Sequence, residues 1–232
     1  MLIATVSLRR GGSRSARVHR SRVIALFLSS LVAGCGGVHG PADVRDDAPE
    51  AVARSVAPYK DASTYDEALQ MWRSPEDINA WIGARFTYDR ARAMALSETQ
   101  RSRTASLAIH APRAFFTSPS GVCVDLSRFA VESLRDVDPD VVPRYVMIEF
   151  APVEIAGNTL RLHWLASFTR DGEHYFFADS KRPGHIAGPY ASTEDFIQDY
   201  ARYRDRQIVA FRELDSYQRK QRALAAKQTA AR

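Results

Sequence analysis

The chain has 232 residues, of which 45% are hydrophobic and 25% are charged, and its formal net charge at pH 7 is +5. Six of the 32 basic residues are arginines within residues 1–22, a segment without any acid; the remaining 26 basic residues are balanced by 27 acidic ones. The basic excess therefore belongs to the first residues of the chain and does not indicate a nucleic-acid-binding protein.

The first predicted element is a secretory signal over residues 1–34. An apolar run over residues 23–32 follows the arginines and is too short to span a membrane permanently. The ending Leu31-Val-Ala-Gly-Cys35 resembles the bacterial lipobox, in which the cysteine is diacylated and becomes the new N-terminus. The resemblance implies a lipoprotein held in the bilayer by the acyl chains on Cys35. The alternative is an ordinary signal peptide with an incidental cysteine.

The same signal predicts the cellular location of the protein. A lipobox implies the bacterial cell envelope. In proteobacterial lipoproteins an aspartate after the cysteine resembles an inner-membrane retention signal, whereas this chain has Gly36. We therefore expect the periplasmic face of the outer membrane.

Three further regions follow the signal. Residues 35–62 are rich in Gly, Ala, Pro and Asp and are predicted to be a tether. Residues 63–212 are long enough for one domain with a hydrophobic core. Residues 213–232 are predicted to be a basic tail, since the last fourteen of them hold five basic residues and no acid.

Within the domain, helices precede a sheet. Ser74-Pro75-Glu76-Asp77 is a strong helix start, residues 89–109 are predicted to be a helix or a long polar connection, and a helical stripe begins after Gly121. Strand-like runs occupy residues 144–150, 159–169 and 174–180. A final helix opens at Ser192 and is expected to include Ile208. This order predicts an α+β domain with an antiparallel sheet.

Cys123 is the first candidate for chemistry. If Cys35 is lipidated, Cys123 keeps its thiol in an exported protein, where thiols are usually paired. It lies in the first turn of the predicted helix, where backbone N–H groups and the helix dipole favour a thiolate and are able to hold an oxyanion. The alternative is a small buried cysteine on an apolar helix.

His163 and Asp179 are the candidates for a base and its orienting carboxylate. Alternation along residues 160–168 places His163 on the mixed face of its strand. A three-residue loop, Arg170-Asp171-Gly172, would put Asp179 opposite His163 on one face. A two-residue Asp171-Gly172 turn would put Asp179 on the other face, so the pairing depends on the loop.

Gly121-Val-Cys123-Val-Asp125, His163-Trp164 on a strand and Asp179 on the next strand together resemble the transglutaminase-like superfamily. This superfamily belongs to the papain-like group and includes a bacterial cysteine-proteinase branch. The resemblance covers residues 78–183 and implies that Cys123 is the nucleophile, His163 the general base and acid, and Asp179 the orienting residue. Many members have an aromatic residue where this chain has Val124, and no upstream glutamine marks an oxyanion donor.

The expected function is acyl transfer on protein or peptide amides, as a peptidase, an amidase or a transglutaminase. The alternative is a non-catalytic binding or scaffolding lipoprotein that keeps the fold. We expect no cofactor, no metal and no nucleic acid as a partner, because no Cys/His spacing suits zinc and Asp136-Val-Asp-Pro-Asp140 lacks the glycine and closing glutamate of a calcium loop.

Overall fold

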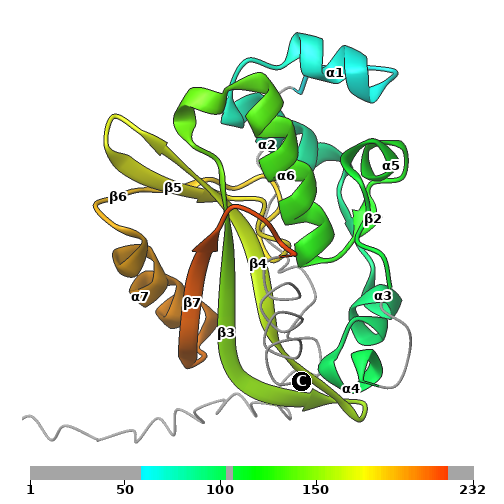
Figure 1. Cartoon of the computed structure of the whole chain (residues 1–232), viewed down its shortest axis with the longest axis vertical. Coiled ribbons are helices and arrows are strands. Elements are labelled where there is room, and N and C mark those ends of the chain that lie inside the picture. Colours follow the sequence, from blue (N-terminus) through cyan, green and yellow to red (C-terminus); the bar gives the residue numbers. More distant parts are fainter. Residues whose placement is uncertain (1–58, 103–106, 219–232) are drawn as a thin grey trace, which may run out of the picture. The chain divides into compact units, whose positions relative to one another are not determined.

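The computed structural model describes residues 59–102 and 107–218, which form an α+β fold around an antiparallel sheet (Figure 1). The α+β prediction is confirmed. The predicted signal, Cys35, the tether up to residue 58 and the tail beyond residue 218 lie outside the described residues, so these assignments stay predictions. No helix in the described ranges combines the length and the apolarity that a bilayer crossing requires.

Seven α-helices and one 3₁₀ turn are found in the described ranges. They are α1 (Tyr65–Met71), α2 (Pro75–Arg85), α3 (Arg90–Ala95), α4 (Glu98–Arg101), α5 (Pro112–Thr117), α6 (Cys123–Val137), η1 (Pro139–Val141) and α7 (Thr193–Arg204). The strands there are β1 (Thr87–Tyr88), β2 (Ser120–Gly121), β3 (Arg144–Ile155), β4 (Asn158–Arg170), β5 (Glu173–Phe177), β6 (Ala187–Tyr190) and β7 (Ile208–Leu214).

The main sheet has the order β6-β5-β4-β3-β7, and all of its neighbouring strands are antiparallel. The two short strands β1 and β2 form a separate parallel pair, which ties the end of α2 to the start of α6. The backbone of Asp89 continues this link by donating its N–H to the carbonyl of Gly121. The residues before α3 are therefore held beside Cys123.

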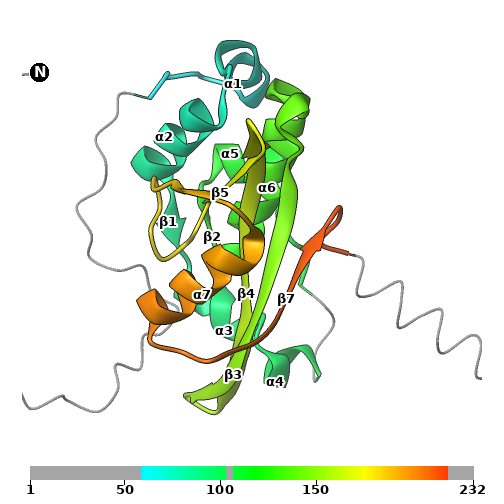
Figure 2. The ribbon, with the colours of Figure 1, turned by 90° about the vertical axis from the view of Figure 1, so that its left-hand side faces the viewer.

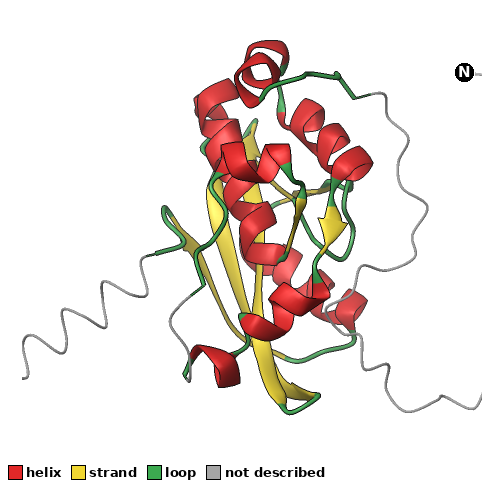
Figure 3. Cartoon of the chain, turned by 90° about the vertical axis from the view of Figure 1, so that its right-hand side faces the viewer, coloured by secondary structure: helices red, strands yellow, loops and turns green. Residues whose placement is uncertain are grey.

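Helices cover both faces of the sheet, and each face has its own core. Figures 1 and 2 show α6 and α7 on opposite sides of the sheet, and Figure 3 shows the other helices gathered on the side of α6. The α6 face of β3 and β4 buries Tyr145, Met147, Trp164, Ala166 and Phe168. The α7 face of the sheet packs Val146, Ile148, Phe150, Leu165 and Phe176 against Phe196, Ile197 and Tyr200 of α7.

Two predicted helix starts are confirmed. Helix α2 begins at Pro75, directly after Ser74, with Glu76 and Asp77 in its first turn. Helix α6 begins at Cys123, and the Asp125 carboxylate accepts a hydrogen bond from the Val122 N–H, which has no partner within the helix. Both starts follow from local chemistry that is readable in the sequence.

The predicted three-residue loop between β4 and β5 is wrong. Thr169 pairs with His174 and Arg170 with Glu173, so the turn consists of Asp171 and Gly172 alone. Both turn residues have positive φ angles, 54° and 80°, as a type I′ hairpin turn requires. Asp-Gly is the sequence that such a turn favours, and it determines the register here.

The predicted strand 174–180 ends early, and the chain after it places Asp179 beside His163, as predicted. Strand β5 stops at Phe177, and Ala178 has a left-handed φ of 56°. This residue breaks the alternation, because Phe177 and Ala178 both pack into the core on the α6 face. Asp179 is thereby turned to the α7 face, although the two-residue turn alone would have placed it on the α6 face.

The C-terminal part also differs from the prediction. Helix α7 ends at Arg204, Asp205 adopts a left-handed φ of 45°, and Ile208 begins the edge strand β7 instead of continuing the helix. Strand β6 was not predicted. The ambiguous segment 89–109 contains the short helices α3 and α4. Short helices and strands, or a residue with a left-handed backbone conformation, thus stand where the sequence predicted longer regular elements.

Candidate functional site

Cys123 lines a narrow cavity of about 60 Å³ on the α6 face of the sheet. The residue is partly exposed and is a thiol, not half of a disulfide. Strand β4 contributes Leu162 and Trp164 to the cavity wall, and Tyr88 lines it from β1. The thiol is therefore accessible from a cavity with a largely apolar floor.

The turn that carries Cys123 is fixed by a buried ion pair. Arg92 of α3 donates Nε to Asp125 Oδ2 at 2.7 Å and Nη2 to Oδ1 at 2.8 Å. The same carboxylate accepts the backbone N–H groups of His110 and Val122. Burial raises the pKa of Asp125, but the hydrogen bonds from Arg92 and from these N–H groups outweigh it and hold the pKa below its usual range.

His163, Asp179 and Tyr200 form a second cluster, which is buried. His163 Nε2 lies 3.0 Å from Asp179 Oδ1 and 3.0 Å from the Tyr200 hydroxyl, and that hydroxyl donates to Asp179 Oδ2 at 2.9 Å. The exposed fractions are 4%, 4% and 1%. Because an ionised carboxylate only accepts hydrogen bonds, the bond to Asp179 requires the proton on Nε2.

Cations surround the carboxylate of this cluster. Burial raises the pKa of Asp179, but the hydrogen bond and charge of His163, the charge of Arg204 and the Lys181 N–H hold that pKa well below its usual range. Arg204 Nη1 also donates to the Tyr200 hydroxyl at 3.0 Å. Burial and the nearby Asp179 charge raise the pKa of Tyr200 well above its ordinary value. The cluster therefore holds a stable carboxylate and a neutral phenol.

The structure brings His163 and Asp179 together, but it does not bring Cys123 to them. In the sheet His163 is paired with Ile148, whose side chain lies in the core on the α7 face. Its neighbours Leu162 and Trp164 point to the α6 face and line the Cys123 cavity. No histidine is among the described residues that line that cavity. His163 and Asp179 thus lie on the α7 face, while Cys123 lines a cavity on the α6 face; the catalytic roles predicted for the three residues stay predictions.

Sequence reasoning missed Tyr200, Arg92 and Leu162. Tyr200 comes from α7, 37 residues after His163, and no local pattern links the two. The Arg92–Asp125 pair joins helices 33 residues apart in the same way. Leu162 was assigned to the apolar face of its strand, but alternation alone does not say that this face is the one toward Cys123.

The described residues contain no group of three or more His, Cys, Asp or Glu side chains arranged to hold a metal ion.

Comparisons with known proteins give structural likenesses but no match in sequence. No family model and no curated protein matches the chain. Among solved structures, calcium-bound LapG of Legionella pneumophila matches with 18% sequence identity and a TM-score of 0.37. The match covers 60% of this chain and 62% of the LapG chain.

Proposed function

We propose that this chain is a peptide-binding lipoprotein of the bacterial cell envelope, with the cavity of Cys123 as its binding site. Under this proposal the chain keeps a transglutaminase-like order of helix and sheet without histidine-assisted catalysis. The observation that carries the proposal is the identity of the β4 side chains beside the thiol: they are Leu162 and Trp164, while His163 lies on the opposite face. Lipidation at Cys35 and a position at the outer membrane remain part of the proposal on sequence grounds.

The chemical argument concerns reach. A general base must lie within about 2.6–3.2 Å of the proton that it takes, or one water away. His163 is paired in the sheet with Ile148, whose side chain lies in the core on the α7 face, whereas the cavity of Cys123 lies on the α6 face. The buried position of His163 is thus explained by a structural role, in which its hydrogen bonds hold β4, the Asp179 segment and α7 together.

The lining of this narrow cavity suits contact with part of a peptide. Leu160, Leu162 and Trp164 provide apolar surface, while Glu98 and Arg161 provide charged groups at the same cavity. Binding sites for organic ligands usually combine an apolar lining with a few polar groups in this way. The envelope address then points to peptide segments of exported proteins or of the cell wall.

The second candidate is acyl transfer, and one observation favours it. Cys123 begins a 15-residue helix and lines a partly open cavity, which is a suitable environment for a nucleophilic thiolate. In that function Cys123 would attack an amide carbonyl, and His163, oriented by Asp179, would protonate the leaving amine. Water or a second amine would then resolve the thioester. This function requires β4 to rearrange so that His163 reaches the α6 face.

Thiol alkylation separates the two functions. The rate of iodoacetamide labelling at Cys123 is measured between pH 5 and 9 by mass spectrometry of the Cys123 peptide, in the wild type, His163→Gln and Leu162→His. For a binding domain, His163→Gln leaves the profile unchanged. Leu162→His places an imidazole on the α6 face and raises the rate at pH 7 about tenfold, equivalent to lowering the thiol pKa by about one unit.

A tenfold fall in labelling at pH 6–7 in His163→Gln would instead support acyl transfer. Circular dichroism of each variant, compared with the wild type, controls for loss of the fold.

A further inference from the structure

The Cys123 cavity adjoins a wider one on the α6 face, and the two together are called the groove here. The second cavity has a volume of about 310 Å³ and is lined by Leu107, Ile109 and Tyr217, among others. The two cavities share four residues: Leu96, Arg101, Val124 and Trp164. These shared residues define the junction. The groove therefore has a narrow end at the thiol and a wide end at Tyr217.

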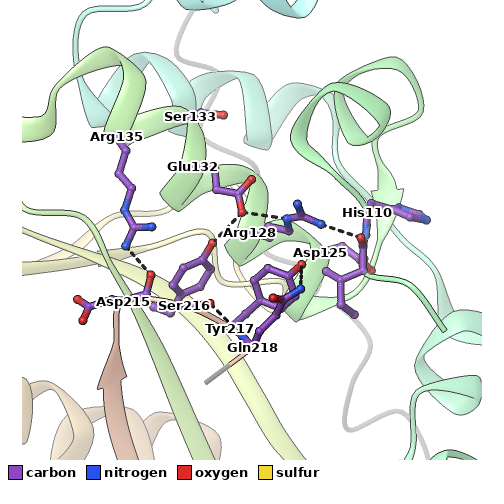
Figure 4. A network of polar contacts seen from close by, with 12 residues as sticks. His110, Asp125, Arg128, Glu132, Ser133, Arg135, Asp215, Ser216, Tyr217 and Gln218 are labelled. Atoms are coloured by element: carbon purple, nitrogen blue, oxygen red, sulfur yellow. Dashed lines mark hydrogen bonds and ion pairs between the residues drawn. The ribbon is translucent and has the colours of Figure 1, made fainter. Parts of the chain in front are cut away.

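The wide end combines apolar side chains with polar ones. Leu107 is 42% exposed there, and Trp164 forms part of the lining. Arg128 lies over the Tyr217 ring at 4.9 Å and donates to Glu132 at 2.9 Å. Figure 4 shows Arg128, Glu132 and Tyr217 gathered in this network. The wide end thus offers a place for an apolar side chain.

One arginine that lines the groove, Arg101, has no carboxylate partner among the described residues. Arg161 is paired with Glu98 at 2.6 Å and with Glu149 at 3.0 Å, and Arg128 is paired with Glu132. Arg101 donates Nε to the Leu96 carbonyl at 2.9 Å, and no carboxylate in the described ranges forms an ion pair with it. A guanidinium at the junction of the two cavities therefore has donors available for a ligand.

We propose that the groove binds an acidic peptide segment, with a ligand carboxylate on Arg101 and an adjacent apolar side chain in the wide cavity. Charge complementarity carries the choice of occupant, because a guanidinium pairs with a planar carboxylate through two parallel hydrogen bonds. The proposal rests on the proposed binding function and names the class of its ligand. Arg101 itself is exposed, so its pairing is worth about a fivefold difference in affinity.

Protection of Cys123 tests this assignment on the full chain. The labelling rate of Cys123 by iodoacetamide is measured while acetyl-Leu-Ala-Asp-amide or acetyl-Leu-Ala-Asn-amide is titrated; the two peptides differ only in the carboxylate. In the wild type the Asp peptide gives half-protection at a concentration about fivefold below that of the Asn peptide. Arg101→Gln removes the difference. The matched control is Arg85→Gln, an exposed charge at the end of α2 outside the groove, which keeps it.

Each other result overturns the inference. Equal protection by both peptides in the wild type rejects the preference for a carboxylate, while peptide binding in the cavity stands. A preference that survives in Arg101→Gln assigns the carboxylate to another cation. Absence of protection by either peptide at millimolar concentration rejects both this inference and the peptide-binding function.

Discussion

At the scale of single residues, the Tyr200 hydroxyl connects the other polar side chains of the buried cluster. It donates to Asp179, accepts from Arg204 and lies 3.0 Å from His163 Nε2. One oxygen on α7 therefore completes the hydrogen bonds of a carboxylate and a guanidinium that are both buried. In the interior, groups of this kind are costly when their bonds are not made.

We expect Tyr200→Phe to lower the free energy of unfolding by about 1–3 kcal/mol, because it leaves Asp179 and Arg204 each short of one bond. Urea unfolding followed by circular dichroism measures the change. The matched control is Tyr190→Phe, whose hydroxyl donates to Asp199 at the surface; it should change the stability by about 0.5 kcal/mol or less. Equal effects of the two substitutions would contradict the role given to Tyr200.

At the scale of elements, the Arg92–Asp125 pair links α3 to the first turn of α6. Arg92 also donates Nη2 to the Ala108 carbonyl at 2.5 Å, so one side chain connects both ends of the segment that borders the groove. The Asp125 side chain is fully buried and the Arg92 side chain is 9% exposed. Removing the arginine leaves a buried carboxylate with only backbone donors.

Arg92→Ala is therefore expected to destabilise the fold by about 3–5 kcal/mol, the usual cost of breaking a buried pair by removing one partner. Chemical denaturation gives the free energy. Arg90→Ala, an exposed arginine on the same helix, serves as the control and should cost far less. If both variants lost the same stability, the pair would not hold α3 to α6.

At the scale of the whole molecule, both buried carboxylates make stability depend on pH. Asp125 and Asp179 have pKa values below their usual range in the folded state. A lowered folded pKa means that the unfolded chain binds protons more readily. The stabilisation is therefore complete above the unfolded value of about 4 and is lost as the pH falls toward the folded values.

We expect the melting temperature to fall steadily as the pH is lowered from about 5 to 3, and to fall less steeply in Asp179→Asn. The amide of this variant keeps the shape of the side chain but no longer titrates. Calorimetric melting at successive pH values measures both slopes. Parallel curves for the variant and the wild type would show that Asp179 contributes nothing to the acid sensitivity.

The sequence predicted much of the fold, because its signals were local. The apolar period after Gly121 predicts the helix that begins at Cys123, and the alternation along residues 160–168 correctly separates Leu162 from His163. The cluster of His163 and Asp179 was predicted with the wrong loop; a left-handed Ala178 compensated for the shorter turn.

The composition of the candidate site was less predictable, since it depends on which helix covers which face. Both faces of β4 are buried, so the alternation separates the two faces without saying which helix covers each. Nothing in the strand says that α6 lies over Leu162 and α7 over His163. Tyr200 and Arg92 likewise reach their partners only after the helices have packed.

The division of the β4 side chains between the two faces of the sheet also constrains how this protein is able to evolve. A one-residue shift in the pairing register of β4 would exchange its side chains between the two layers, taking Trp164 out of one core and Leu165 out of the other. Such a change would disrupt both cores, so it would not yield a folded protein with an imidazole beside the thiol. A histidine at the cavity of Cys123 would therefore arise more readily by substitution of a residue that already lines it, such as Leu162, than by a shift of the whole strand.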